Sequence, residues 1–173
     1  MPRLLLVLIA AALLATPAMG GGYLDDFAAD FDDFTTKMND LGDAFPDGHF
    51  SWRPAEGIRS VSESIVHVAG ANFFLTQALG VPMPEDFSRD AEKTITAKKD
   101  VLALLKKSQE HVQKALEKAK GTDLDREIEI FGGKRTARGV FMIIAGHNHE
   151  HLGQLIAYAR STDVVPPWSA GGN

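Results

Sequence analysis

Apolar residues recur every three or four positions in four separate segments of this 173-residue chain, a spacing typical of amphipathic helices. The first three segments end at glycines, which favour helix termination. A fifth segment, Arg126-Glu127-Ile128-Glu129-Ile130, alternates apolar and charged residues ahead of two glycines, which predicts a short β-hairpin or an extended crossover before the last helix. The whole pattern predicts an all-α fold, a four-helix bundle with one long crossover. The expected helices cover residues 23–42, 60–79, 97–120 and 136–160.

The amino terminus has the pattern of a secretory signal. Arg3 precedes an unbroken apolar run of 12 residues, from Leu4 to Ala15, and small residues follow up to Gly20. Because a membrane-spanning helix needs about 20 apolar residues, the run favours a cleavable signal peptide over residues 1–20, cleaved near Gly20. We therefore expect a periplasmic or secreted protein with one domain over residues 23–168 and no stable membrane span. An uncleaved anchor and a misassigned start codon are the alternatives.

Composition removes several classes of chemistry. The chain has no cysteine, which excludes disulfides, thiolate metal ligands, a cysteine nucleophile and a lipid-modified amino-terminal cysteine. Loss of residues 1–20 would remove one arginine and no acidic residue, so the net charge would move from −5 to −6. Nucleic acid is not an expected partner, because an acidic domain gains nothing from neutralising phosphates.

Two histidines of the last helix lie on one stripe. At 100° per residue, His147 and His151 share a side with apolar residues such as Ile144 and Leu155, while His149 faces the opposite way. An i, i+4 pair of imidazoles can bind one metal ion. The alternative is two core histidines, each of which would need its own hydrogen-bond partner.

The remaining polar candidates are less clear. The second helix is apolar on almost every side, so its periodicity does not decide whether His67 faces the core or the solvent. Glu63 stands one turn before His67 and could orient that imidazole or act as a base, but it also has the spacing of a capping-box partner of Ser60. His49 and His111 are expected at the surface, in a glycine-containing loop and among charged residues.

Several short motifs occur in an order that resembles one family. The motifs are Trp52-Arg53-Pro54, Ser60-Val61-x-Glu63-x-x-x-His67, His147-x-x-x-His151-x-Gly153-Gln154-Leu155, and Trp168 after two prolines. The second motif opens the second helix, and the third lies on the last helix. Together they resemble the DinB-like superfamily of bacterial four-helix metalloproteins over about residues 23–168.

The resemblance implies a metal site. In that family one histidine of the second helix and two of the fourth bind a divalent ion, usually zinc or nickel, and these correspond to His67, His147 and His151. Members often read His-x-x-His-His-Arg-Gly-Gln, whereas this chain has Glu150 for the middle histidine and Leu152 for the arginine. The second change removes a cation that could bind a substrate anion.

Three histidines leave a zinc ion with an open position, as in catalytic sites. The expected function is thus a metal-dependent hydrolase or transferase acting on a small molecule of unknown structure. Some relatives use low-molecular-weight thiols as cosubstrates, which an exported protein would not normally meet. Two alternatives are a non-catalytic metal or ligand binder of the cell envelope, and a structural bundle with core histidines. A second copy of the chain, in a homodimer, is the other partner considered.

Overall fold

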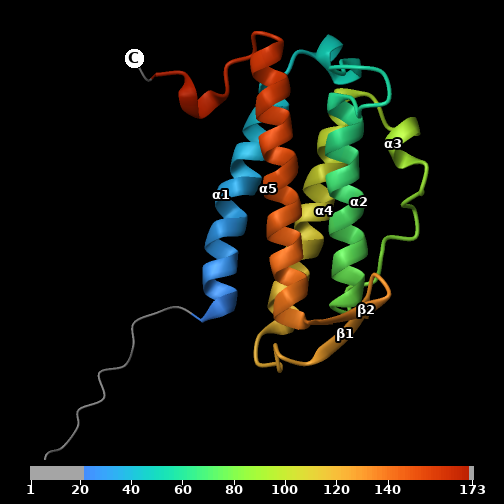
Figure 1. Cartoon of the computed structure of the whole chain (residues 1–173), viewed down its shortest axis with the longest axis vertical. Coiled ribbons are helices and arrows are strands. Elements are labelled where there is room, and N and C mark those ends of the chain that lie inside the picture. Colours follow the sequence, from blue (N-terminus) through green and yellow to red (C-terminus); the bar gives the residue numbers. More distant parts are fainter. Residues whose placement is uncertain (1–21, 172–173) are drawn as a thin grey trace, which may run out of the picture.

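Four long helices form the bundle, as predicted. The computed structural model describes residues 22–171. Helix α2 packs against α4 and α5, and α1 packs against α5 and α4. Figure 1 shows that α2 and α4 run in the same direction, so the connection between them crosses the length of the bundle. The helices are α1 (Tyr23–Ala44), α2 (Val61–Ala78), α4 (Lys98–Ala119) and α5 (Ala137–Ser161).

The two helices that carry the histidines begin at side-chain caps. At the start of α2, the Ser60 hydroxyl accepts the Glu63 amide and the Glu63 carboxylate accepts the Ser60 amide, a complete capping box. At the start of α5, the Thr136 hydroxyl accepts the amide of Gly139 at 3.0 Å. These caps satisfy free amides in the first turns, so the sequence itself defines where both helices begin.

The core lies between the helices and is rich in phenylalanine. On α1 the three- and four-residue spacing of apolar residues becomes one buried stripe, which faces α4 and α5. Gly42 of α1 allows a close approach to α4, since a Cβ there would lie 2.6 Å from Leu102 Cδ2. The buried residues of the α1 stripe are Phe27, Phe31, Phe34, Thr35, Met38, Leu41 and Gly42.

The alternating segment forms the predicted hairpin. Strand β1 (Glu127–Ile130) pairs antiparallel with β2 (Gly133–Thr136), with Ile130 opposite Gly133. The two-residue turn has positive φ at both positions, 54° at Phe131 and 71° at Gly132, as the favoured hairpin turns require. The hairpin leads directly into α5 at one end of the bundle (Figure 1).

Short helical turns occur where the sequence predicts only irregular chain. The crossover contains α3 (Ala91–Thr94), whose Ala91 is buried against the bundle, and α3 contacts α2. Two 3-10 turns, η1 (Asp47–Ser51) and η2 (Pro167–Ser169), flank the bundle. Residues 1–20, the expected signal peptide, lie outside the described residues. Within residues 22–171, no helix combines the length and the apolar character that a membrane crossing needs.

The expected surface position of His111 is wrong. Its side chain is buried, with 9% of the residue exposed, and the ring lies edge-on to Phe73 of α2 at 4.8 Å between centroids. His111 faces α2 from the same side of α4 as Ser108, Val112 and Ala115, and Nδ1 lies 3.2 Å from the Lys107 carbonyl oxygen. His49 is half-buried in η1, so its expected exposure holds only in part.

Candidate metal centre

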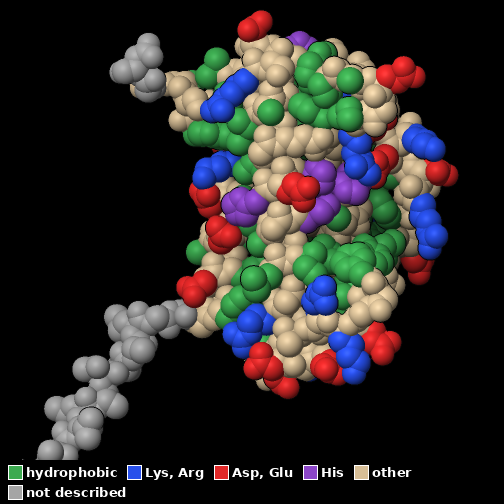
Figure 2. Space-filling model, viewed as in Figure 1, with side chains coloured by type: hydrophobic (Ala, Val, Ile, Leu, Met, Phe, Trp, Pro, Cys, Tyr) green, Lys and Arg blue, Asp and Glu red, His purple; other side chains and the backbone are tan. Residues whose placement is uncertain are grey.

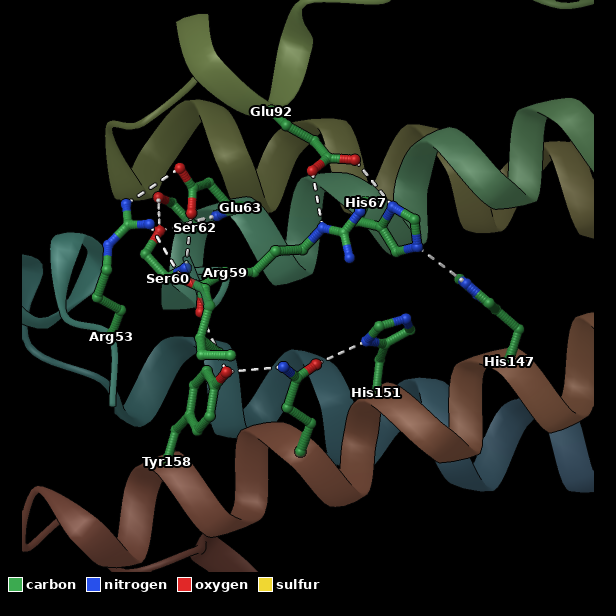
Figure 3. A network of polar contacts seen from close by, with 12 residues as sticks. Arg53, Arg59, Ser60, Ser62, Glu63, His67, Glu92, His147, His151 and Tyr158 are labelled. Atoms are coloured by element: carbon green, nitrogen blue, oxygen red, sulfur yellow. Dashed lines mark hydrogen bonds and ion pairs between the residues drawn. The ribbon is translucent and has the colours of Figure 1, made fainter. Parts of the chain in front are cut away.

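The structure brings three histidines together from two helices. His67 projects from α2, and His147 and His151 project from α5 toward it, as Figure 3 shows. The Nε2 atoms of His67 and His147 are 3.2 Å apart. One nitrogen from each of the three rings lies within 4.8 Å of the other two. The apolar stripe of α5 therefore faces α2, and it presents both of its histidines there.

A carboxylate orients His67. The Nδ1 atom of His67 lies 2.8 Å from Glu92 Oε1, and Arg59 Nε donates to Glu92 Oε2 at 2.8 Å. A carboxylate can only accept, so Nδ1 of His67 carries the proton and donates it to Glu92. The Nε2 lone pair of His67 then points toward the other two rings.

An amide orients His151 in the same way. Nδ1 of His151 lies 2.7 Å from Gln154 Oε1, and Gln154 Nε2 donates to the Tyr158 hydroxyl at 2.7 Å. That hydroxyl donates in turn to the Arg59 carbonyl oxygen at 3.0 Å. Because the amide oxygen accepts, Nδ1 of His151 is the donor and its Nε2 is free to bind a ligand. Arg59 thus supports His67 through its side chain and His151 through its backbone (Figure 3).

His147 has no such support. Its Nδ1 atom is buried and has no hydrogen-bond partner within residues 22–171. Burial is the main cause that lowers the pKa of His147 to about 4, and the neighbouring His151, His67 and Arg59 contribute in the same direction. Burial also lowers the pKa of His151, against the opposing effect of its bond to Gln154. These two imidazoles are therefore neutral near pH 7, which is the form that binds metals.

The donor set fits a divalent ion. Zinc binds imidazole nitrogens at about 2.0–2.1 Å and prefers tetrahedral geometry, which places two nitrogen ligands about 3.3 Å apart. The 3.2 Å separation of the His67 and His147 Nε2 atoms matches that value. The anchored Nδ1 atoms of His67 and His151 give the outer hydrogen bonds that metal-binding histidines almost always have.

Comparison with known proteins identifies the family. A family model described as the DinB superfamily matches residues 30–155, most of the chain. The chain belongs to the DinB superfamily. An uncharacterized protein, YjoA from Bacillus subtilis (strain 168), is 29% identical over 125 residues, which are 70% of this chain and 79% of that protein.

Two crystal structures of DinB-like proteins share the fold. The structure of YjoA from Bacillus subtilis superimposes with a TM-score of 0.62 at 23% identity, and covers 84% of this chain and 94% of that one. A DinB-like protein from Bacillus cereus ATCC 10987 gives a TM-score of 0.62 at 18% identity, with the same coverage. These structures support the bundle architecture of this DinB superfamily member.

Glu63 lies away from the imidazoles of this DinB superfamily member. Its carboxylate accepts hydrogen bonds from the Ser60 amide at 2.7 Å and from Arg53 Nη2 at 3.1 Å. The Ser60 amide and Arg53 together lower the pKa of Glu63. Arg53 also donates to the Ile58 carbonyl oxygen, so these contacts shape the loop that positions Arg59. The catalytic role of Glu63 stays a prediction.

The structure also places the remaining family motifs. Trp52 packs edge-on against Tyr158 at 5.3 Å between centroids, beside the chain of bonds that supports His151. His149 is exposed and faces Asp30 at 3.4 Å, away from the centre, as its position on the helix predicts. Leu152, at the family's arginine position, is buried. Arg59, which comes from the loop before α2, is connected to His67 through Glu92.

A cavity opens beside the centre. It has a volume of about 740 Å³ and is lined by His67, His147 and Glu92 together with mostly apolar side chains from α2, the crossover and the hairpin. Figure 2 shows histidine side chains grouped in the middle of the face viewed, with hydrophobic side chains next to them. The centre is therefore accessible to a small molecule.

The depressed pKa of His147 predicts a pH dependence of stability. Its pKa is about 4 in the folded protein, against 6.5 for the free side chain. The folded state therefore resists protonation of His147, so stability is complete above pH 6.5 and falls as the pH drops toward 4. Urea denaturation of metal-free protein at several pH values measures this loss. His147→Gln should flatten the pH dependence in that window, and an unchanged profile would refute the assignment.

Proposed function

We propose that this protein is an exported metalloenzyme. In this proposal His67, His147 and His151 hold a divalent ion, zinc or nickel, and the protein is a hydrolase or transferase of a small molecule. The observation that carries it is the convergence of three imidazoles, two of which donate from Nδ1 and therefore have unprotonated Nε2 atoms. In the alternative without an ion, the 3.2 Å contact is a hydrogen bond in which Nε2–H of His147 donates to Nε2 of His67, and measurement of metal content distinguishes the two arrangements.

Side chains around the proposed ion have different roles. A divalent ion held by His67, His147 and His151 would supply an acidified water or polarise a carbonyl or phosphoryl oxygen. Glu92 holds the proton on Nδ1 of His67, and Gln154 does the same for His151. These bonds fix both rings before a ligand arrives. The unsupported His147 borders the cavity through which a substrate would approach.

Export rests on the sequence alone. Arg3, the apolar run and the small residues before Gly20 support a cleaved signal. The absence of cysteine means that none of the proposed chemistry depends on the redox state of the compartment. The proposed site uses only imidazoles and a carboxylate, which function equally in the periplasm and outside the cell.

A substrate screen tests the enzymatic part. Purified protein loaded with zinc or nickel is assayed against panels of esters, amides and phosphoesters, beside a His147→Ala variant. We expect hydrolysis of at least one class, with a loss of at least about 100-fold in the variant, since a misplaced ion no longer meets the substrate correctly. Activity that survives His147→Ala would exclude catalysis at this centre. A bound metal with no activity in any panel would favour the non-catalytic binder.

Glu92 should control metal affinity without binding the metal. Removing an outer partner of a metal-binding histidine typically lowers affinity about 10- to 100-fold. We expect Glu92→Ala to weaken zinc binding by this amount in a competition titration, and Glu92→Gln to recover part of the loss because its amide oxygen still accepts from His67. The exposed Glu110 of α4 gives the matched control, Glu110→Ala. Equal affinities for all four proteins would contradict the role of Glu92.

A further inference from the structure

The cavity beside the histidines suggests which molecules the centre accepts. We propose that it binds an amphipathic carboxylate, or an ester of one, with its apolar body in the cavity and its polar head at the histidines. This inference rests on the proposed metal centre for the head, but the apolar part rests only on the cavity. Experiments can therefore refute the binding of the polar head and the binding of the apolar body separately.

The cavity wall is built for an apolar body. Besides the histidines and Glu92, its lining includes Phe74 and Phe87. Gly70 of α2 lets Phe87 of the crossover lie against the helix, because a Cβ at that position would come within 3.1 Å of the Phe87 ring. Pockets for small molecules commonly combine such apolar walls with a few polar groups at one place. Here the polar groups gather where His67, His147 and Glu92 meet the cavity.

The hairpin turn adds an exposed aromatic ring to the same wall. Phe131 is 68% exposed and has a φ of 54°, a conformation that bulky residues rarely adopt. Its ring lies 5.5 Å from the ring of Phe74, which is also exposed. The hairpin turn accounts for the positive φ but not for the choice of an exposed phenylalanine there. The ring contributes little to the core, and its presence is explained if it covers a ligand.

Arg89 adds a cation to the cavity lining. The residue is exposed, and among residues 22–171 its guanidinium has no ion-pair or hydrogen-bond partner. Nearby acidic groups already have partners: Asp86 pairs with Lys107, and Glu92 pairs with Arg59 and His67. A guanidinium recognises carboxylates by charge-assisted hydrogen bonds. The unpaired Arg89 and the proposed ion both favour an anionic or ester head.

A second pocket, next to the cavity, gives further space for the apolar part of the proposed ligand. It has a volume of about 690 Å³, lies along the hairpin and shares Phe74, Gln77 and Phe131 with the cavity. A chain of several methylenes, or an aromatic ring, could follow this wall away from the histidines. Short polar acids such as acetate would leave it unfilled. Apolar length should thus contribute most of the affinity.

Calorimetric titration with sodium butyrate and sodium octanoate tests the inference. Each buried methylene should increase affinity about three- to fourfold, and octanoate has four more methylenes than butyrate, so it should bind roughly 80- to 250-fold more tightly, in metal-free and in zinc-loaded protein. Phe131→Ser should reduce this ratio several-fold, while Met142→Ser, at another exposed apolar residue outside the cavity, should leave it unchanged. Equal affinities for the two acids, or a ratio that Phe131→Ser does not alter, would overturn the proposal.

The anionic head has its own test. Arg89→Gln should weaken octanoate binding about tenfold and leave the binding of uncharged 1-octanol unchanged, with Lys99→Gln as the exposed control. Octanol binding as tight as octanoate binding, or no effect of Arg89→Gln, would overturn this part. Zinc content is measured on the same samples. Protein that takes up no zinc but keeps the chain-length dependence would refute the metal centre and leave the cavity proposal standing.

Discussion

Replacing His151 with alanine is expected to abolish stoichiometric metal binding. Zinc-loaded protein should carry about one ion per chain, whereas His151→Ala should lose it on dialysis, with affinity reduced on the order of 1,000-fold or more. The reason is that a direct ligand is lost, which exceeds the 10- to 100-fold effect of an outer partner. Elemental analysis after dialysis measures the content, and competition with a chelating dye measures the affinity.

The same helix offers the matched control. His149→Ala removes an imidazole two positions away that is exposed and faces Asp30 rather than the centre, so its metal content should equal that of the natural protein. Zinc should also raise the melting temperature of the natural protein and of His149→Ala, because a ligand that binds only the folded state stabilises it. Unaltered zinc content in His151→Ala would contradict the role of that histidine.

Truncating Phe141 should cause the largest loss of stability. Its ring is fully buried, with 0% exposed, and packs edge-on against Phe27 at 4.9 Å between centroids, which joins α5 to α1. Removing a buried phenylalanine side chain typically costs about 3–5 kcal/mol, because apolar contacts are lost and a cavity remains. We therefore expect Phe141→Ala to lower the free energy of unfolding by this amount in a urea titration.

The next residue provides the control for this prediction. Met142 is 63% exposed, and exposed substitutions usually change stability by less than about 0.5 kcal/mol, so Met142→Ala should unfold at nearly the urea concentration of the natural protein. Both residues lie more than a turn before His147, so neither change removes a proposed ligand. A loss below about 1 kcal/mol for Phe141→Ala would mean that α1 and α5 do not pack as described.

The helices and half of the centre follow from local sequence patterns. Apolar periodicity predicts the last helix over residues 136–160, and the structure has α5 over Ala137–Ser161. The same periodicity separates His147 and His151 from His149, because a stripe on a helix is a local property. The alternating segment followed by glycines likewise predicts a short hairpin or an extended crossover, and the structure has the hairpin. Local periodicity is therefore sufficient to predict an element, and the direction of its side chains, where one face of that element is distinctly apolar.

The positions of His67 and Glu92 in the candidate site depend on contacts between segments that are far apart in the sequence. Helix α2 is buried on most sides, so its pattern does not tell which side meets α5, and only the family resemblance indicated His67. Glu92 lies 25 residues after His67 in a one-turn helix of the crossover, and nothing in its neighbours signals that contact. Sequence spacing pointed instead to Glu63, whose carboxylate completes the capping box with Ser60.

His111 shows a different reason for error. Its charged neighbours suggested a solvated position, yet its spacing from Ser108, Val112 and Ala115 places it on the buried side of α4. Periodicity was the better guide there, because burial on an amphipathic helix depends on the angle around the axis and not on adjacent residues. Phe73 of α2 then covers the ring.

Anomalous diffraction from crystals grown with zinc shows whether the three imidazoles share one ion. We expect one anomalous peak per chain, about 2.0–2.1 Å from an Nε2 atom of each of His67, His147 and His151, with Glu92 and Gln154 still bonded to the Nδ1 atoms. No peak between these rings, or an ion bound through Nδ1 with those bonds broken, would contradict it.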